Sequence, residues 1–311
     1  MNELLLLIMG IAGLWIGAES VVHGSENIAK FFKLSPLLIG LTIVSIGTSL
    51  PEIAVSVAGG LERLRGIETS GIVVGNALGS CLNLITILLG IIGVVGGILI
   101  ITKRELIRDG LMLLGSIVFF FFVSLDGKLT RLEGAIMITI YIIYFINLFR
   151  EERIKEKRRE PTRIWTDIIA LVAGLAIVII SSKMTVDNGV FLAQMWGIRE
   201  SLVGILIVGL GTGLPELAVS LTAIRHKNIA IAVGNLIGSN ICDLLFSLGL
   251  GTVISGFIVG KNLLKFDIPF MFGAAVLILL LFRRKMRLKR KEAILLILVY
   301  IVYAGLKLKG F

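Results

Sequence analysis

Long runs of apolar residues, separated by short polar stretches, fill nearly the whole sequence. Each run has about 20 apolar residues, the length that an α-helix needs to cross the hydrocarbon core of a bilayer. The pattern predicts ten membrane-spanning helices with bounds of about 4–22, 36–59, 71–98, 106–124, 131–149, 165–183, 200–224, 229–257, 266–282 and 292–306. The third and eighth runs are longer than one crossing requires, which indicates tilted or broken helices.

The longest polar stretch, residues 150–163, divides these runs into two groups of five. Because five is an odd number, the two groups must cross the membrane in opposite directions, which is an inverted-topology repeat. We therefore expect an all-α membrane protein with a first five-helix repeat at 1–149, a charged linker at 150–163 and a second, inverted repeat at 164–311.

The positive charges predict the orientation of the chain. The formal net charge is +10, but the basic residues gather in short clusters between apolar runs, which is typical of orientation signals and does not imply nucleic acid. With the 150–163 linker in the cytoplasm, 21 of the 31 lysines and arginines fall on the cytoplasmic side. We expect a multi-pass protein of the cell membrane with both termini outside the cell. The N-terminus lacks a basic region and a cleavage site, so it begins the first membrane helix.

Two motifs recur in the same order in both halves. The first reads Gly-Thr-Ser-Leu-Pro-Glu at residues 47–52 and Gly-Thr-Gly-Leu-Pro-Glu at residues 211–216. The second begins Gly-Asn and ends Gly-Ser, at residues 75–80 and again at 234–239. Two separate motifs in corresponding runs indicate that the chain arose by duplication.

The first motif places Glu52 and Glu216 inside membrane-spanning runs, where an unpartnered carboxylate is costly and marks a functional site. The proline before each glutamate lacks an N–H and frees carbonyl oxygens of the preceding turn. Thr48 and Glu52 are four residues apart and therefore share one face of the helix, as do Thr212 and Glu216. Carbonyl, hydroxyl and carboxylate oxygens suit hard cations such as Na⁺ and Ca²⁺. The alternative explanation is a structural kink with a snorkelling glutamate. Two symmetric copies make that explanation less favourable than a single copy would.

The second motif has a structural explanation of its own, because small residues four apart allow close packing of membrane helices. Polar residues follow the motif, however, and they include Ser80, Asn83, Ser239, Asn240 and Asp243. Asp243 is a third carboxylate within a membrane-spanning run, and helix packing alone does not require an aspartate there.

The paired motifs resemble those of the cation/calcium antiporter superfamily and, within it, the prokaryotic sodium/calcium exchangers, over nearly the whole chain. The resemblance implies secondary active antiport of Na⁺ against Ca²⁺ by alternating access, with an ion cluster at the membrane midplane. The metal-binding residues that it implies are Glu52, Glu216, Asp243, Thr48, Thr212, Ser49, Ser80, Ser239, Asn83 and the backbone carbonyls of Ser45 and Gly209.

Two departures from the family pattern make this implied site asymmetric. Ser49 corresponds to Gly213, which lacks the hydroxyl of one sodium site. The family places an asparagine four residues after Ser80, where this chain has Leu84, while Asn83 lies three residues after it. A shift of one residue turns a side chain by about 100°, so either a local bulge restores the geometry or Asn83 does not coordinate.

Other functions remain as alternatives. The proton-coupled branch of the family carries acidic residues where this chain has Gly79 and Gly238, which favours sodium coupling over proton coupling. A proton- or potassium-coupled exchanger of the same fold remains an alternative. A cation channel usually forms around an oligomer axis, whereas two inverted halves around one site suit a carrier. We expect no enzyme activity and no cofactor besides the transported ions, because no nucleophile accompanies the glutamates. We also expect a functional monomer surrounded by lipid, with Cys81 and Cys242 as free thiols.

Overall fold

The computed structural model describes residues 2–151, 164–196 and 211–309, and these residues are almost entirely helical. In the labels used here, η marks π-helical segments. The first half contains α1 (Asn2–Phe32), α2 (Pro36–Ile39), η1 (Gly40–Val44), α3 (Ser45–Thr48), α4 (Leu50–Leu64), α5 (Ser70–Asn83), η2 (Leu84–Leu88), α6 (Leu89–Gly96), β1 (Ile98–Ile100), α7 (Lys103–Val123), β2 (Lys128–Leu129) and α8 (Arg131–Glu151). The second half contains α9 (Ile164–Met195), α12 (Leu214–Arg225), α13 (Ile229–Ile241), η4 (Cys242–Ser247), α14 (Leu248–Ser255), β3 (Phe257–Ile258), η5 (Leu263–Asp267), α15 (Ile268–Arg283), β4 (Arg287–Lys289) and α16 (Arg290–Leu308).

Helices long and apolar enough to cross a membrane make this a multi-pass membrane protein. The described residues contain seven such stretches, or eight if the bent pair Pro36–Thr48 and Leu50–Leu64 counts as one span. The predicted run at 292–306 lies within α16, and the predicted run at 200–224 begins outside the described residues and continues as α12.

Two helices are longer than the sequence pattern predicts. α1 continues to Phe32 instead of ending near residue 22, and α9 continues to Met195 instead of ending near residue 183. Both extensions include charged residues, such as Lys30 and Asp187. Hydropathy marks where a helix leaves the hydrocarbon, not where it ends, and a helix can continue into the polar interface.

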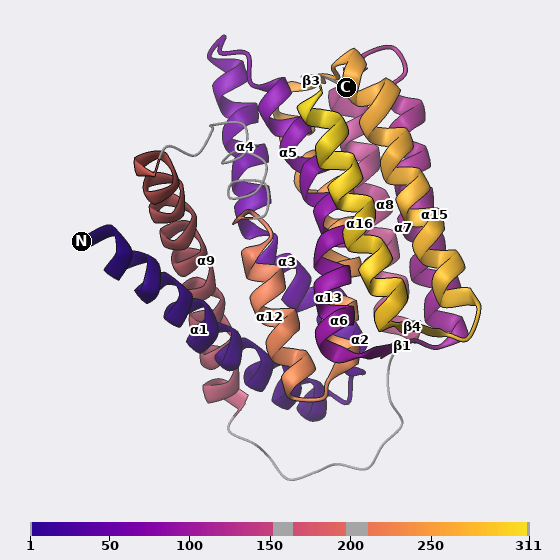
Figure 1. Ribbon diagram of the computed structural model, residues 1–311. Coiled ribbons are helices and arrows are strands. Elements are labelled where there is room, and N and C mark those ends of the chain that lie inside the picture. The colour runs from indigo at the N-terminus through magenta and orange to yellow at the C-terminus, as the bar shows by residue number, and fades with distance from the viewer. Residues whose placement is uncertain (1, 152–163, 197–210, 310–311) are drawn as a thin grey trace.

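α1 and α9 lie side by side at one edge of the molecule, and the remaining helices form a bundle beside them (Figure 1). Glycines bring the two helices together. A Cβ atom on Gly17 would lie 2.9 Å from the carbonyl oxygen of Gly174, and one on Gly174 would lie 2.8 Å from that of Gly17. Small residues of this kind allow membrane helices to pack at backbone contact.

The continuous stretches α5–η2–α6 and α13–η4–α14 form the centre of the bundle. Buried residues make up 72% and 78% of their apolar windows, compared with 22–33% for the other spanning helices. α13 also packs closely on α2 and η1. The contact leaves no room for a side chain at Gly234, where a Cβ atom would lie 2.8 Å from the carbonyl oxygen of Leu37. This contact brings α3 next to α13.

Two short antiparallel sheets, which the sequence did not predict, connect the halves at opposite ends of the molecule (Figure 1). In one, β1 pairs with β4, and Leu99 lies opposite Leu288. In the other, β2 pairs with β3, and Leu129 lies opposite Phe257. All four side chains are buried, so each sheet covers one end of the core.

Candidate functional site

A broken helix of the first half and the first turn of α12 form one side of the candidate site. The axis bends by 48° between Thr48 and Leu50, directly before Pro51, as the sequence predicts. In the second half Pro215 occupies the same place in the first turn of α12. Glu52 and Glu216 therefore lie in the first turns of α4 and α12, where free N–H groups and the helix dipole favour negative charge.

One carbonyl freed by the prolines has a partner outside the candidate site. Pro215 removes the hydrogen bond to Gly211 four residues earlier, and the oxygen of Gly211 accepts a hydrogen bond of 3.2 Å from the hydroxyl of Ser182 on α9. A carbonyl oxygen has two lone pairs, so the expectation that the freed carbonyls converge on a cation stays a prediction at Gly211.

Three carboxylates are buried at the centre of the bundle. Glu52, Glu216 and Asp243 are 2%, 1% and 0% exposed. Both oxygens of each glutamate, and Oδ1 of Asp243, have no hydrogen-bond partner among the described residues. Buried charges are costly unless they are paired or coordinate a metal ion, so these oxygens suit cations.

Hydroxyl groups from both halves surround these carboxylates. Ser80 on α5 donates a hydrogen bond of 2.7 Å to Oδ2 of Asp243, which lies in η4. Thr48 lies 3.4 Å from the hydroxyl of Ser239 on α13, and Ser239 donates to the carbonyl oxygen of Ser45 at 3.4 Å. The structure thus brings together hydroxyl, carbonyl and carboxylate oxygens from segments that are far apart in the sequence.

Three further predicted site residues are Ser49, Thr212 and Gly209. Ser49 is fully buried, and its hydroxyl has no partner among the described residues. Thr212 is half-buried in the segment that precedes α12. Gly209 lies outside the described residues.

A π-helical bulge does occur near Asn83, but it does not shift Asn83 relative to Ser80. The bulge, η2, begins at Leu84, and Asn83 itself has α-helical dihedral angles of −59° and −47°. Asn83 is nonetheless buried, with 5% of its surface exposed. The second half has a matching bulge, η4, that includes Asp243. π-Helical turns often occur at functional sites, and these two occupy corresponding positions.

Asn235 joins the two halves of the site, although the sequence did not assign it a role in ion binding. Its Oδ1 accepts a hydrogen bond of 3.1 Å from Thr48, while its Nδ2 donates to the backbone oxygen of Glu216 at 3.3 Å and to Ser220 at 3.1 Å. The signal was present in the second motif, where this asparagine follows the glycine in both copies.

Asn240 is a second residue that the predicted ligand set omitted. It is 1% exposed, and neither polar atom of its side chain has a partner among the described residues. It directly follows Ser239, so sequence proximity to a predicted ligand was the available signal.

The carboxylates do not form a chelating cluster by themselves. Within the described ranges, no three His, Cys, Asp or Glu side chains converge closely enough to hold a metal ion. Cation binding here therefore needs the hydroxyl and carbonyl oxygens as well. A site of this mixed kind suits a cation that is bound reversibly.

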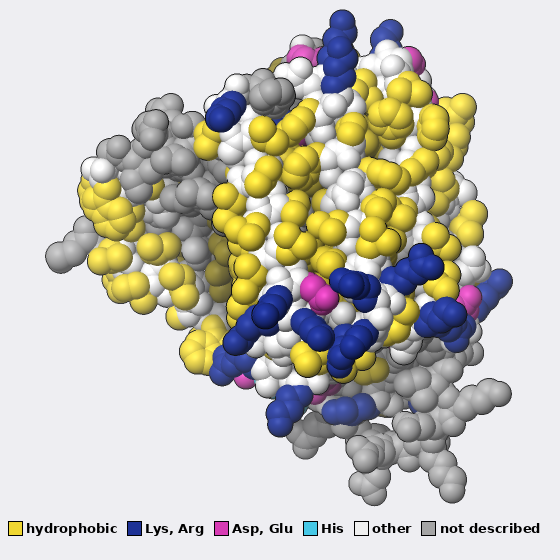
Figure 2. All heavy atoms as spheres, turned by 45° about the vertical axis from the view of Figure 1, so that its right-hand side comes forward, with side chains coloured by type: hydrophobic (Ala, Val, Ile, Leu, Met, Phe, Trp, Pro, Cys, Tyr) yellow, Lys and Arg dark blue, Asp and Glu magenta, His cyan; other side chains and the backbone are white. Residues whose placement is uncertain are grey.

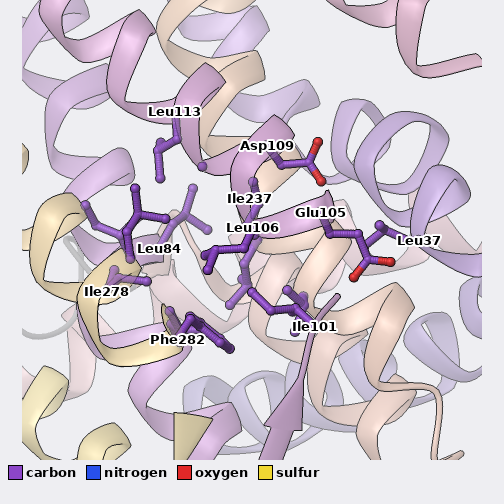
Figure 3. Close-up of a pocket in the computed structure, with 16 residues that line it drawn as sticks. Leu37, Leu84, Ile101, Glu105, Leu106, Asp109, Leu113, Ile237, Ile278 and Phe282 are labelled. Atoms are coloured by element: carbon purple, nitrogen blue, oxygen red, sulfur yellow. The ribbon is translucent and has the colours of Figure 1, made fainter. Parts of the chain in front are cut away.

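A separate, apolar cavity lies between α7, α13 and α15 and is lined by side chains such as Leu84, Leu113 and Ile278 (Figure 3). Glu105 and Asp109 reach one edge of it, but Asp109 is paired with Arg108 at 2.7 Å and accepts a hydrogen bond from Tyr144. Its volume of about 30 Å³ and its apolar walls do not suit an ion.

Known proteins resemble this chain over almost its full length. The sequence pattern of the sodium/calcium exchanger protein family matches residues 2–150 and 166–309. A putative antiporter, CaxA of Alkalimonas amylolytica, is 32% identical over 311 residues, which cover 96% of each chain. The sodium/calcium exchanger MaX1 of Methanosarcina acetivorans is 29% identical, also over 96% of each chain. Among solved structures, the sodium-calcium exchanger NCX_Mj soaked with Na⁺ and Ca²⁺ has a TM-score of 0.84 at 28% identity, covering 98% of each chain.

Proposed function

Because the chain belongs to the sodium/calcium exchanger family, we propose that it is a secondary active antiporter that exchanges Na⁺ for Ca²⁺ across the membrane. The observation that carries the proposal is the set of buried carboxylates, Glu52, Glu216 and Asp243, with oxygens that have no partner among the described residues. Such a set is unfavourable in a membrane interior unless cations neutralise it.

In this proposal, calcium binds between the first turns of α4 and α12, with oxygens of Glu52, Glu216, Thr48 and Thr212. Sodium ions use overlapping positions that add Ser49, Ser80, Ser239 and Asp243, together with the carbonyl groups of Ser45 and Gly209. Asn83 completes the proposed set from α5. The buried hydroxyl of Ser49 and the bond between Ser80 and Asp243 support the first-half side of this arrangement.

Antiport follows from competition for one small anionic cluster. Two different sets of cations cannot both be bound well by the same carboxylates, so Na⁺ displaces Ca²⁺ and the reverse. The empty cluster is expected to resist the change of access, because carboxylates without cations are costly in a dry bilayer centre. Alternating access with these two properties couples the two ion flows.

An inverted repeat of five helices in each half, ten in total, is the architecture that we propose. The repeats are 1–149 and 164–311, joined by the linker 150–163. The two sheets support it, because adding 159 to Ile98 and Lys128 gives Phe257 and Arg287, the first residues of β3 and β4. The paired bulges η2 and η4 support it as well. We place the linker in the cytoplasm and both termini outside, in accord with the bias of the basic residues.

Uptake by membrane vesicles tests this function. Vesicles loaded with Na⁺ are diluted into Na⁺-free buffer that contains radioactive calcium, with and without a protonophore. The proposal predicts calcium uptake that requires the outward Na⁺ gradient and persists when the proton gradient is collapsed. Uptake that ignores Na⁺, or that stops with the protonophore alone, contradicts sodium coupling.

A further inference from the structure

An open groove runs between α15 and α16 on the outer face of the bundle. Its volume is about 530 Å³, and all its lining residues are apolar, from Phe270 and Leu277 on α15 to Leu295 and Val302 on α16. Gly273 forms part of its floor, and a Cβ atom there would meet no other atom within 4 Å. The lining extends over about 12 Å along α15, so the groove is long and narrow enough for a hydrocarbon chain.

Positive charge gathers at one end of this face. Figure 2 shows apolar side chains across the middle of the face and Lys and Arg side chains at its lower end. Three exposed cations there, Arg284, Lys285 and Lys291, form no ion pair with any described residue. The Nε atom of Arg287 is buried and likewise has no acceptor within the described part of the chain. Glu292, the acid next to Lys291 in the sequence, accepts the backbone N–H of Lys289 at 2.7 Å.

Two of these cations lie on the helix faces that line the groove. Arg284 follows Leu277 by seven residues, and Lys291 precedes Leu298, another lining residue, by seven. Seven residues are close to two helical turns, so each cation lies on the stripe that lines the groove. Arg284 lies about 10 Å beyond Leu277 along α15, and Lys291 lies about 6 Å beyond Leu295 along α16, which suits a phosphate at the interface above an acyl chain.

The opposite end of the groove is less basic: Lys261, Lys265 and Lys309 are exposed there, compared with seven Lys and Arg residues between 283 and 291. Lys307 donates to Oδ2 of the buried Asp267 at 2.8 Å, and the hydroxyl of Tyr303 donates to Oδ1 at 2.6 Å. The charge of Lys307 is therefore neutralised within the protein. An amphipathic anion is expected to bind with its head at Arg284 and Lys291 and its chain toward Val302.

We propose that this groove binds an anionic phospholipid, with one acyl chain between α15 and α16 and its phosphate held by Arg284 and Lys291. Charge complementarity selects the headgroup, because cations next to a membrane attract anionic lipids. The site belongs to the cytoplasmic leaflet under the orientation proposed above, but binding itself does not depend on that orientation or on the ions transported.

Native mass spectrometry of the full chain, released from detergent and titrated with phosphatidylglycerol or phosphatidylcholine, tests the proposal. The expected result is one saturable phosphatidylglycerol adduct that binds at least tenfold more tightly than phosphatidylcholine. The Arg284→Gln/Lys291→Gln variant should weaken phosphatidylglycerol binding about tenfold, since each cation contributes attraction to the anionic headgroup. Gly273→Leu should remove the adduct by filling the groove, for which the structure has room.

The matched control is Arg283→Gln/Lys285→Gln, which removes the same charge from positions off the groove stripe and should retain the adduct. Equal weakening by both double variants would overturn the proposal, because it would indicate general attraction without a site. Equal affinity for the two lipids would overturn it too. If the protein forms a dimer and Gly273→Leu abolishes that dimer, the groove would instead be assigned to a second copy of the chain. Sodium-driven calcium uptake by each variant shows separately whether it is folded.

Discussion

Glu52 and Glu216 both follow a proline in the first turn of a helix, α4 and α12 respectively, yet their surroundings differ. Glu52 follows Ser49, whose hydroxyl is buried, whereas Glu216 follows Gly213, which has none. Asn235 holds the backbone of Glu216, and the corresponding Asn76 is half-buried on α5. The binding site therefore consists of two unequal halves. We expect its preference between Na⁺ and Ca²⁺ to depend on the positions at which the halves differ.

Neutral replacement of either glutamate is expected to abolish exchange. Glu52→Gln or Glu216→Gln keeps the shape of the side chain but removes a negative charge that cations need. Sodium-driven calcium uptake should fall at least a hundredfold, while the elution profile on size-exclusion chromatography stays unchanged. Glu62→Gln on α4 is the control, because Glu62 forms an exposed pair with Arg65, and such pairs contribute about 0–1 kcal/mol. Normal uptake by either central variant would refute the site assignment.

Ser80→Ala is expected to weaken binding without abolishing it. Ser80 donates to Asp243 at 2.7 Å, and a hydrogen bond to a charged group contributes about 1.5–3 kcal/mol. The half-saturating sodium concentration should therefore rise about tenfold in the uptake assay, with the maximal rate less affected. Ser116→Ala on α7 removes a buried hydroxyl that bonds only its own helix, and it should leave the sodium dependence unchanged. An equal shift in both variants would argue against a role for Ser80.

At the scale of the elements, proline and glycine determine the geometry of the site. The sequence predicted the break before Pro51 because proline cannot continue the backbone hydrogen bonds, and the helix bends there. It did not predict β1 to β4, because two or three residues paired across distant loops leave no alternating pattern. The exact partners of Asn235 and Asn240 were also beyond prediction, since they depend on how α13 rotates against α3 and α12.

Close packing of α13 on α2 and η1 is expected to be essential for stability. A Cβ atom on Gly234 would lie 2.8 Å from the oxygen of Leu37 and 3.0 Å from the nitrogen of Leu41, and backbone atoms cannot move aside easily. Gly234→Ala should lower the free energy of unfolding by about 1–3 kcal/mol, seen as a lower melting temperature in detergent. Gly115→Ala on α7, where a Cβ atom meets nothing within 4 Å, should melt no lower than the unchanged protein, because alanine favours the helix. A Gly234→Ala protein of unchanged stability would contradict this packing argument.

The molecule as a whole combines a central pair of long helical stretches with a pair, α1 and α9, at one edge. Each small sheet joins a loop of one half to a loop of the other, and the two sheets lie at opposite ends. Hydropathy alone predicted most membrane-spanning stretches, because burial in lipid requires about 20 apolar residues. It could not predict how far α1 and α9 extend beyond the lipid, since polar residues also form helix there.

Inverted orientation of the halves predicts that equivalent loops lie on opposite sides of the membrane. Asp126 precedes β2 and Lys285 precedes β4, and both are exposed. An Asp126→Cys variant should react with an impermeant maleimide from outside the cell, and Lys285→Cys only after the membrane is opened. Both native cysteines are buried, so the unchanged protein should not react and serves as the control. Labelling of both variants from the same side would contradict the inverted repeat.

Competition between sodium and calcium for one cluster of carboxylates is the central claim, and equilibrium binding of radioactive calcium to the purified protein tests it most directly. Sodium should raise the apparent dissociation constant for calcium, more steeply than in proportion to its concentration if several sodium ions bind, and leave the number of calcium sites unchanged. Calcium binding that sodium does not weaken would contradict the account.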